Sequence, residues 1–241
     1  EVPESAVILG GGPVGIELGQ MLRRYGAAVT IVQSSDRLID REEPRVSELI
    51  EEALRADGIE LRLGQKAIAA SADDTCKTVK LDSGDTVTAE RLIVATGRRP
   101  RADGLGLETL GIELGEHGEV PTDERCRVTD GVWATGDVTA VAVFTHVGKD
   151  QARSACADIA DEVASADYSA IPRAVFTDPE IAAVGLTTLQ ASAEGIAVAE
   201  GVGVVARDGR PTPGRVHRHR VAQRGRLGSA GPVRRDRAQL G

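Results

Sequence analysis

Three glycines near the amino terminus have the spacing needed to hold a phosphate group. Gly10, Gly12 and Gly15 follow the G-x-G-x-x-G pattern directly after the apolar run at residues 7–9. The first glycine permits a tight turn, the second lets the backbone approach a pyrophosphate, and the third lets a helix pack closely on the preceding strand. N–H groups at the start of that helix would then face the phosphates. The pattern predicts a dinucleotide-binding site.

The elements around these glycines are expected to form a strand–helix–strand unit. Apolar residues recur at helical spacing and predict a helix that packs this face on the sheet: Val14, Leu18, Met21, Leu22 and Tyr25. Gly26 is placed to end the helix, and Ala28–Val32 reads as the next strand. This context favours a dinucleotide site over a glycine-rich turn of another α/β protein.

The end of the second strand bears on which dinucleotide is bound. An acid there would bond the ribose hydroxyls of NAD, whereas an arginine would favour the 2′-phosphate of NADP. Gln33 is neutral, and the following Asp36 and Arg37 argue in opposite directions, so the choice stays open. The nucleotide-binding residues expected in this unit are Gly10, Gly12, Pro13, Val14, Gly15 and Gln33.

Further along, the chain alternates between helical and strand patterns. A second helix is expected from Pro44 to Asp57, with a proline suited to its first turn. Strand patterns follow at five places: Ile59–Leu63, Ala67–Ala70, Lys77–Leu81, Thr86–Thr88 and Arg91–Ala95. The sequence Asp-Ser-Gly-Asp at 82–85 predicts a hairpin turn. Together these patterns indicate an α/β fold.

Three later segments resemble one family of flavoenzymes. Residues 95–100 read Ala-Thr-Gly-Arg-Arg-Pro, residues 132–138 read Val-Trp-Ala-Thr-Gly-Asp-Val, and residues 171–185 read Ile-Pro-Arg-Ala-Val-Phe-Thr-Asp-Pro-Glu-Ile-Ala-Ala-Val-Gly. They are similar to the NAD(P)-domain exit, the second FAD motif and the interface-domain opening of the class I pyridine-nucleotide-disulfide oxidoreductases. That family includes lipoamide dehydrogenase, glutathione reductase and mercuric reductase, and the resemblance covers residues 1–205.

The resemblance implies roles for residues outside the glycine pattern. Gly97, Arg98, Gly136 and Asp137 would contact a cofactor, with Asp137 bonding a ribityl hydroxyl of FAD. An aspartate at the end of a short strand, here 132–134, is equally suited to cap the next helix.

Two further residues have competing interpretations. His146 stands before a helix expected from Lys149 to Ala164, and by resemblance it would contact the flavin, although a histidine here also suits a helix start. Glu17 by resemblance pairs with a lysine beside the flavin's reactive nitrogen, and otherwise complements the helix dipole.

The resemblance also implies how the chain is divided. Residues 1–98 would form the NAD(P)-binding Rossmann-like domain, 99–166 the second FAD-binding segment, and 167–205 the start of an α+β interface domain that forms a homodimer. The family's first FAD segment does not occur, and no two cysteines are close enough in sequence to form its redox pair. The family's C-terminal His-Pro-Thr-x-x-Glu does not occur either, because His217 and His219 are each followed by arginine. We therefore expect a truncated chain. Because the sequence has no signal-peptide pattern and no apolar run of about 20 residues, we also expect it to be cytoplasmic.

The resemblance implies a flavoprotein oxidoreductase that uses FAD and NAD(P). Hydride would pass from NAD(P)H to the flavin, and electrons from there to a disulfide, a metal ion or a quinone-like acceptor. The alternative is a non-catalytic NAD(P)-binding fragment of such an enzyme. Cys76, Cys126 and Cys156 have no metal-ligand or redox-pair spacing, so no metal site is expected.

The last residues differ in composition from the rest. Residues 206–241 contain ten arginines and two aspartates, while the whole chain of 241 residues carries a net charge of −8. This tail is expected to be a disordered basic arm or, as we favour, the product of a shifted reading frame in a GC-rich gene. Resequencing that showed an intact frame would contradict the second interpretation. Nucleic acid is not an expected partner, because the acidic body would repel it.

Overall fold

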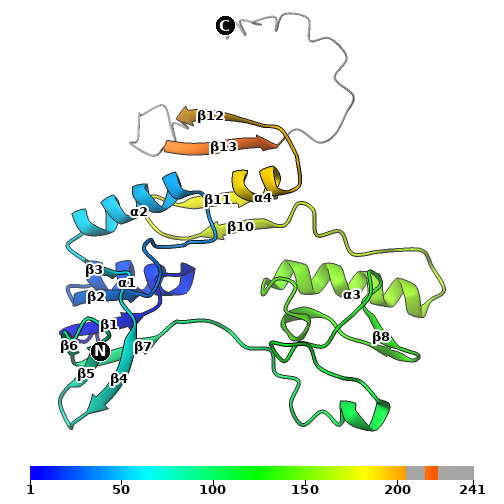
Figure 1. Ribbon diagram of the computed structural model, residues 1–241, viewed down its shortest axis with the longest axis horizontal. Coiled ribbons are helices and arrows are strands. Elements are labelled where there is room, and N and C mark those ends of the chain that lie inside the picture. Colours follow the sequence, from blue (N-terminus) through cyan, green and yellow to red (C-terminus); the bar gives the residue numbers. More distant parts are fainter. Residues whose placement is uncertain (205–214, 222–241) are drawn as a thin grey trace, which may run out of the picture. The chain divides into compact units, whose positions relative to one another are not determined.

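The computed structural model describes residues 1–204 and 215–221, shown in Figure 1. The chain divides into two compact units, residues 1–185 and residues 186–241. The first unit carries all the residues singled out above for cofactor binding. The domain limits expected from the sequence stay predictions.

A parallel four-stranded sheet forms the centre of the first unit. Its strands are β1 (Ser5–Leu9), β2 (Ala28–Gln33), β3 (Glu60–Leu63) and β7 (Arg91–Val94), in the order β3-β2-β1-β7. The expected α/β fold with a parallel sheet is confirmed. Because β1 lies between β2 and β7, the turn that follows it opens at the carboxyl end of the sheet, where α/β proteins bind ligands.

The first helix, α1 (Pro13–Arg24), packs on this sheet by a face that the sequence did not predict. Its buried residues are Gly15, Ile16, Gly19 and Gln20. Of the expected apolar stripe, Val14, Met21 and Tyr25 are exposed, so that prediction was wrong for these three, while Leu18 and Leu22 are half-buried against the core. The glycines lie on the inner face because the helix approaches the strands too closely for side chains: a Cβ on Gly19 would stand 2.9 Å from Ile31 Cδ1.

The second helix and a small antiparallel sheet complete the nucleotide-binding part. Helix α2 spans Pro44–Ala56, close to the limits expected. The antiparallel sheet comprises β4 (Ala67–Ala72), β5 (Lys77–Leu81) and β6 (Thr86–Ala89), and β5 and β6 are joined by the expected turn at 82–85. Two apolar clusters form the core; one lies between the helices and the parallel sheet, and the other includes Val7, Val32, Val79, Leu81 and Ala89.

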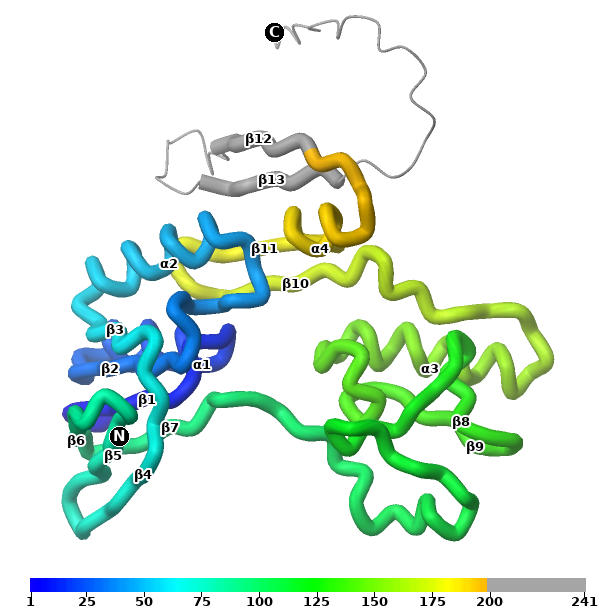
Figure 2. Tube along the Cα trace, viewed as in Figure 1, coloured from blue at the N-terminus to red at the C-terminus, as the bar shows by residue number. Residues whose placement is uncertain are grey.

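Residues 99–166 contain few regular elements, as the trace in Figure 2 shows. They comprise the 3₁₀ turns η1 (Leu107–Leu110) and η2 (Gly136–Thr139), the short strands β8 (Arg127–Thr129) and β9 (Val132–Trp133), and helix α3 (Thr145–Ile159). Helix α3 begins four residues earlier and ends five residues earlier than the sequence suggested. The Thr-His-Val-Gly stretch, which was expected to precede the helix, is its first turn.

The first unit ends with the hairpin β10 (Pro172–Val175) and β11 (Ile181–Val184). Val175 belongs to the larger apolar cluster of the parallel sheet, and Ile181 packs against it. Arg173 forms a two-bond ion pair with Glu42, in which Nε lies 2.8 Å from Oε1 and Nη2 lies 3.1 Å from Oε2. The hairpin is thus fixed to the nucleotide-binding part by apolar and charged contacts together.

The second unit contains α4 (Thr188–Ala193), β12 (Val198–Val204) and β13 (Arg215–Val221). Strands β12 and β13 pair antiparallel, from Val198 opposite Val221 to Val204 opposite Arg215. The sequence predicted no regular element after residue 206, and for residues 215–221 this was wrong, because pairing with β12 satisfies their backbone groups. The remainder of the expected tail lies outside the described residues. Within the described part of the chain, no helix has the length and apolar content needed to span a membrane.

Candidate nucleotide- and flavin-binding site

The glycine-rich turn after β1 is built by close backbone contacts. The Gly10 N–H donates to the Val32 carbonyl oxygen at 2.8 Å, and Gly10 has a φ of +104°. A Cβ on Gly10 would stand 2.4 Å from the Ala95 oxygen, and one on Gly15 would stand 1.9 Å from the Gly10 oxygen. Two of the three glycines are therefore required by packing within the protein itself, which brings α1 close to β1.

The remaining glycine of the pattern faces open space. An added Cβ on Gly12 would meet nothing within 4 Å, although Gly12 is the N-cap of α1. No side chain caps this helix end, and no acidic residue occupies its first turn. Pro13 and Val14 beside it are exposed. The end of α1 thus presents free N–H groups and a partial positive charge at an open position, as an anion site requires.

Gln33, at the end of β2, is tied to the glycine-rich turn. Its side-chain oxygen accepts a hydrogen bond from the Gly11 N–H at 2.9 Å. The Gly11 carbonyl oxygen in turn accepts from the Ile39 N–H at 2.9 Å, and a Cβ on Gly11 would stand 2.4 Å from Leu38 Cδ2. The sequence analysis did not single out Gly11, because it falls at a variable position of the motif. Its contacts join the turn to the loop that follows β2.

Arg98, expected to contact a cofactor, and Asp137, expected to contact FAD, are brought together. Arg98 Nη1 lies 3.2 Å from Asp137 Oδ2, and both side chains are substantially exposed. Gly97 before Arg98 has nothing within 4 Å of an added Cβ. An exposed ion pair of this kind contributes little stability, so both side chains are free to exchange this contact for one with a ligand.

A buried glutamine that the sequence analysis missed positions the Gly136–Asp137 turn. Gln151 of α3 is fully buried, and its oxygen accepts from the Gly136 N–H at 2.6 Å. Its amide nitrogen donates to the Thr139 hydroxyl and to the Tyr168 hydroxyl, each at 3.0 Å. Gly136 has a φ of +81°, which glycine adopts without strain. A glutamine on an amphipathic helix gives no signal in sequence, since polar residues ordinarily face water.

His146 lies in the first turn of α3 and is exposed. Its ring stacks on Phe144, with 5.3 Å between ring centroids and 14° between the ring planes. No side chain caps this end of α3, and no acidic residue lies in its first turn. The helix end is therefore a second position with free N–H groups, and the histidine adds a hydrogen-bonding ring beside it.

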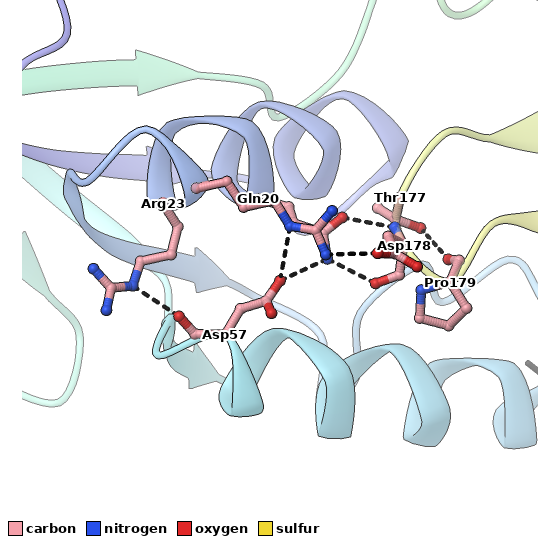
Figure 3. Close-up of polar contacts among 7 residues, drawn as sticks. Gln20, Arg23, Asp57, Thr177, Asp178 and Pro179 are labelled. Carbon is pink, nitrogen blue, oxygen red and sulfur yellow. Dashed lines mark hydrogen bonds and ion pairs between the residues drawn. The ribbon is translucent and has the colours of Figure 1, made fainter. Parts of the chain in front are cut away.

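Glu17 contacts the hairpin that ends the first unit. Its Oε1 accepts from the Phe176 N–H at 2.8 Å. One turn further along α1, Gln20 pairs with the Asp178 backbone: the Asp178 N–H donates to Gln20 Oε1 at 2.7 Å, and Gln20 Nε2 donates to the Asp178 carbonyl at 2.8 Å (Figure 3). Gln20 Nε2 also lies 2.8 Å from Asp57 Oδ2. These residues join α1 to residues almost 160 positions away.

The cysteines do not form a redox centre in the described residues. Cys76, Cys126 and Cys156 are all free thiols. Burial raises the pKa of Cys126, whose sulfur lies 4.0 Å from the Tyr168 hydroxyl. A raised pKa keeps the thiol protonated and unreactive at neutral pH. No group of three or more His, Cys, Asp or Glu side chains in the described part of the chain could hold a metal ion.

The parallel sheet, the glycine-rich turn and the open helix end define an α/β protein of the dinucleotide-binding class. A family model described as pyridine nucleotide-disulphide oxidoreductase matches residues 1–159, and that of the same family's dimerisation domain matches residues 171–216. The chain therefore belongs to the class I pyridine nucleotide-disulphide oxidoreductases, which include lipoamide dehydrogenases and mercuric reductases. Family members bind FAD and NAD(P). The dimerisation match extends beyond residue 205, where the sequence analysis ended the resemblance.

Several curated relatives and solved structures are similar to the chain. A mercuric reductase from Streptomyces lividans is 40% identical over 202 residues, which cover 82% of this chain and 42% of that protein. A dihydrolipoyl dehydrogenase from Geobacillus stearothermophilus is 35% identical, with 82% and 43% covered. The Cu(II) complex of the HOCl-induced flavoprotein disulfide reductase RclA from Escherichia coli has a TM-score of 0.77 at 29% identity, covering 84% of this chain and 47% of that one. The chain thus spans less than half the length of these proteins.

Proposed function

We propose that the chain is the nucleotide-binding and second flavin-binding part of an oxidoreductase that passes hydride from NAD(P)H to FAD. When bound, the flavin supplies a two-electron acceptor that can hand electrons to a disulfide, a metal ion or a quinone-like acceptor. The observation that carries the proposal is the uncapped end of α1 behind Gly12, where the backbone is open to a phosphate. Membership of the family supports the identity of the two cofactors.

The residues around α1 fit a dinucleotide. The pyrophosphate would lie against the Gly12 backbone and the N–H groups of the first turn, since nothing in the protein occupies the space beside Gly12. Gly10 and Gly15 would act indirectly, by allowing the turn and the helix to approach each other. Pro13, Val14 and Gln33 line the same turn, and Gly97 and Arg98 follow the strand on its other side.

The residues around η2 fit one part of a flavin site. Gln151 fixes the Gly136 backbone, which leaves the half-exposed Asp137 carboxylate able to accept from a hydroxyl. The uncapped end of α3 and His146 would stabilise negative charge by hydrogen bonding and by the helix dipole. Glu17 would hold the nearby end of the hairpin through the Phe176 N–H, and its second carboxylate oxygen would be available to a cation.

The acceptor and the assembly are further parts of the proposal. A mercuric reductase and a dihydrolipoyl dehydrogenase are both among the relatives, which supports a metal ion or a disulfide as the acceptor class. We infer a homodimer through the segment that matches the dimerisation model. Phe176 and Val184 of that segment expose large apolar side chains, 77% and 64% accessible, as a protein interface would use.

The visible absorption spectrum of the purified chain with added FAD tests the proposal. We expect flavin bands that remain after gel filtration and that bleach on addition of NADH or NADPH. The matched variant is Asp137→Leu, which removes the carboxylate from η2 and the ion-pair partner of Arg98, and should lower the retained flavin more than it lowers nucleotide binding. A chain that retains no flavin and still binds NAD(P)H would leave only the alternative, a nucleotide-binding fragment. A chain that binds neither cofactor would contradict both.

A further inference from the structure

The hydrogen bond between Gln33 and Gly11 fixes which end of the Gln33 amide remains available. A backbone N–H can only donate, so the side-chain atom 2.9 Å from Gly11 must be the amide oxygen. The Gln33 NH₂ group is therefore the part left for a ligand, and it can only donate hydrogen bonds. A hydroxyl oxygen and a phosphate oxygen both accept from such a group.

Arg37, the arginine that could bind a 2′-phosphate, forms hydrogen bonds within its own loop instead. Arg37 Nη1 donates to the Glu42 carbonyl at 2.8 Å and to the Ser47 hydroxyl at 3.0 Å, and Nη2 donates to the Asp40 carbonyl. Ser47 is buried in α2 and itself donates to the Leu38 carbonyl at 2.7 Å. Arg37 thus stabilises the loop between β2 and α2. If its side chain turned toward a ligand, the Glu42 and Asp40 carbonyl groups would lose their hydrogen-bond donor.

We propose that Gln33 makes this a coenzyme site without a charge preference, one that accepts NADH and NADPH with similar affinity. This inference rests on the proposed nucleotide site. The Gln33 NH₂ group would donate to the ribose 2′-oxygen of NADH or to the 2′-phosphate of NADPH. Gln33 itself carries no charge to repel the phosphate, and Arg37 is engaged in its own loop. The two dissociation constants should lie within about fivefold of each other, because the stronger hydrogen bond to the charged phosphate is offset by the cost of removing that phosphate from water.

Equilibrium titration of the purified chain with NADH and with NADPH, followed by calorimetry, measures this ratio without requiring turnover. The decisive variant is Gln33→Glu, which keeps an oxygen for the Gly11 N–H and replaces the donor by a negative charge. We expect this variant to raise the dissociation constant of NADPH at least about tenfold and to change that of NADH by less than about threefold. The reason is that the phosphate adds two negative charges at this position.

Arg37→Gln is the matched control. If the arginine stabilises only its loop, this variant lowers thermal stability and leaves the ratio of the two dissociation constants unchanged. A selective loss of NADPH affinity in Arg37→Gln would overturn the inference, as would a native chain that prefers either coenzyme by more than tenfold. Absence of binding by both coenzymes would instead overturn the proposed function, and the inference would fall with it.

Discussion

The glycine-rich turn and the Gly136–Asp137 turn hold their backbones in place by different means. The first lies over a parallel sheet with two apolar clusters, and its geometry comes from backbone atoms in direct contact. The second lies in a segment without such a cluster among the described residues, and the buried Gln151 side chain fixes it through three hydrogen bonds. Where apolar area is scarce, a satisfied polar network specifies the conformation instead.

Asp158 extends the polar construction of the second region. This aspartate of α3 is 8% exposed and accepts hydrogen bonds from three side chains. One donor lies in β9, one in β8 and one just before β8. The Trp133 Nε1–H lies 2.9 Å away, and the Arg125 and Arg127 guanidinium groups each lie 3.1 Å away. The contrast between the two regions therefore predicts that the first is sensitive to added volume and the second to lost hydrogen bonds.

The largest effect is expected for Gly15→Ala. The new methyl group would stand 1.9 Å from the Gly10 oxygen, so α1 and β1 must separate. Overpacking of a rigid contact costs about 3 kcal/mol, which urea unfolding followed by circular dichroism would measure. NAD(P)H binding should be lost in the same variant.

Gly12→Ala is the matched control for that experiment. Its methyl group meets nothing within 4 Å, so stability should change by less than about 0.5 kcal/mol. We expect weaker NAD(P)H binding in this variant, because the methyl group would occupy the space proposed for the pyrophosphate. Equal destabilisation by the two substitutions would contradict the proposed difference between a packed and an open glycine.

Gln151→Leu tests the polar region and should come next in size. Leucine has a similar volume but leaves the Gly136 N–H without its acceptor and two hydroxyls without their donor. Leaving such groups unpaired in a buried position costs about 2 kcal/mol. Thermal unfolding measures the loss, and hydrogen exchange should speed up first at Gly136.

Gln151→Glu separates the two halves of this network. It retains an oxygen for Gly136 and removes the donor to Thr139 and Tyr168. We expect exchange at Gly136 to stay slow in this variant although the protein is destabilised. Fast exchange there in both variants would show that Gln151 fills volume and does not position the turn.

Gln20→Leu probes a polar contact of the apolar region, the one between α1 and Asp178. Gln20 is 4% exposed and binds both the N–H and the carbonyl of Asp178. The Asp178 side chain is 73% exposed, so water can reach this part of the hairpin and replace the lost bonds. We therefore expect a loss of only about 1 kcal/mol in urea unfolding. A loss as large as that of Gln151→Leu would contradict the proposed difference between the apolar and the polar region.

Asp158→Asn tests the charge in the polar region. The Trp133 hydrogen bond and then those of Arg125 and Arg127 lower the pKa of Asp158 below its usual value of 3.8. A pKa that is lower in the folded protein gives stability above about pH 4, and this stability is lost as the pH falls through the folded pKa. The variant should be less stable at neutral pH and should lose less stability between pH 4 and pH 2, measured by thermal unfolding. Asp130→Asn, at an exposed turn residue, should leave this pH dependence unchanged.

The sequence by itself determined the parallel strand–helix–strand unit and the glycine pattern. Short apolar runs that end at turn residues favour buried strands, and the glycine spacing is imposed by the turn, so both can be predicted from local sequence. The family resemblance also followed from contiguous motifs. The limits of α1, α2 and the strands were close to those observed for the same reason.

Only the tertiary structure decided which side chains hold these elements in place. Two of the four buried residues of α1 are glycines because the sheet approaches the helix closely, which apolar periodicity cannot show. The buried Gln151 side chain binds the Gly136 backbone, and Arg37 binds Ser47 of α2. Sequence spacing does not reveal either pair of partners. Gln20 meets Asp178 across 158 positions. A polar side chain reads as solvent-facing until the fold supplies its partner, because burial and hydrogen bonding are properties of the assembled structure.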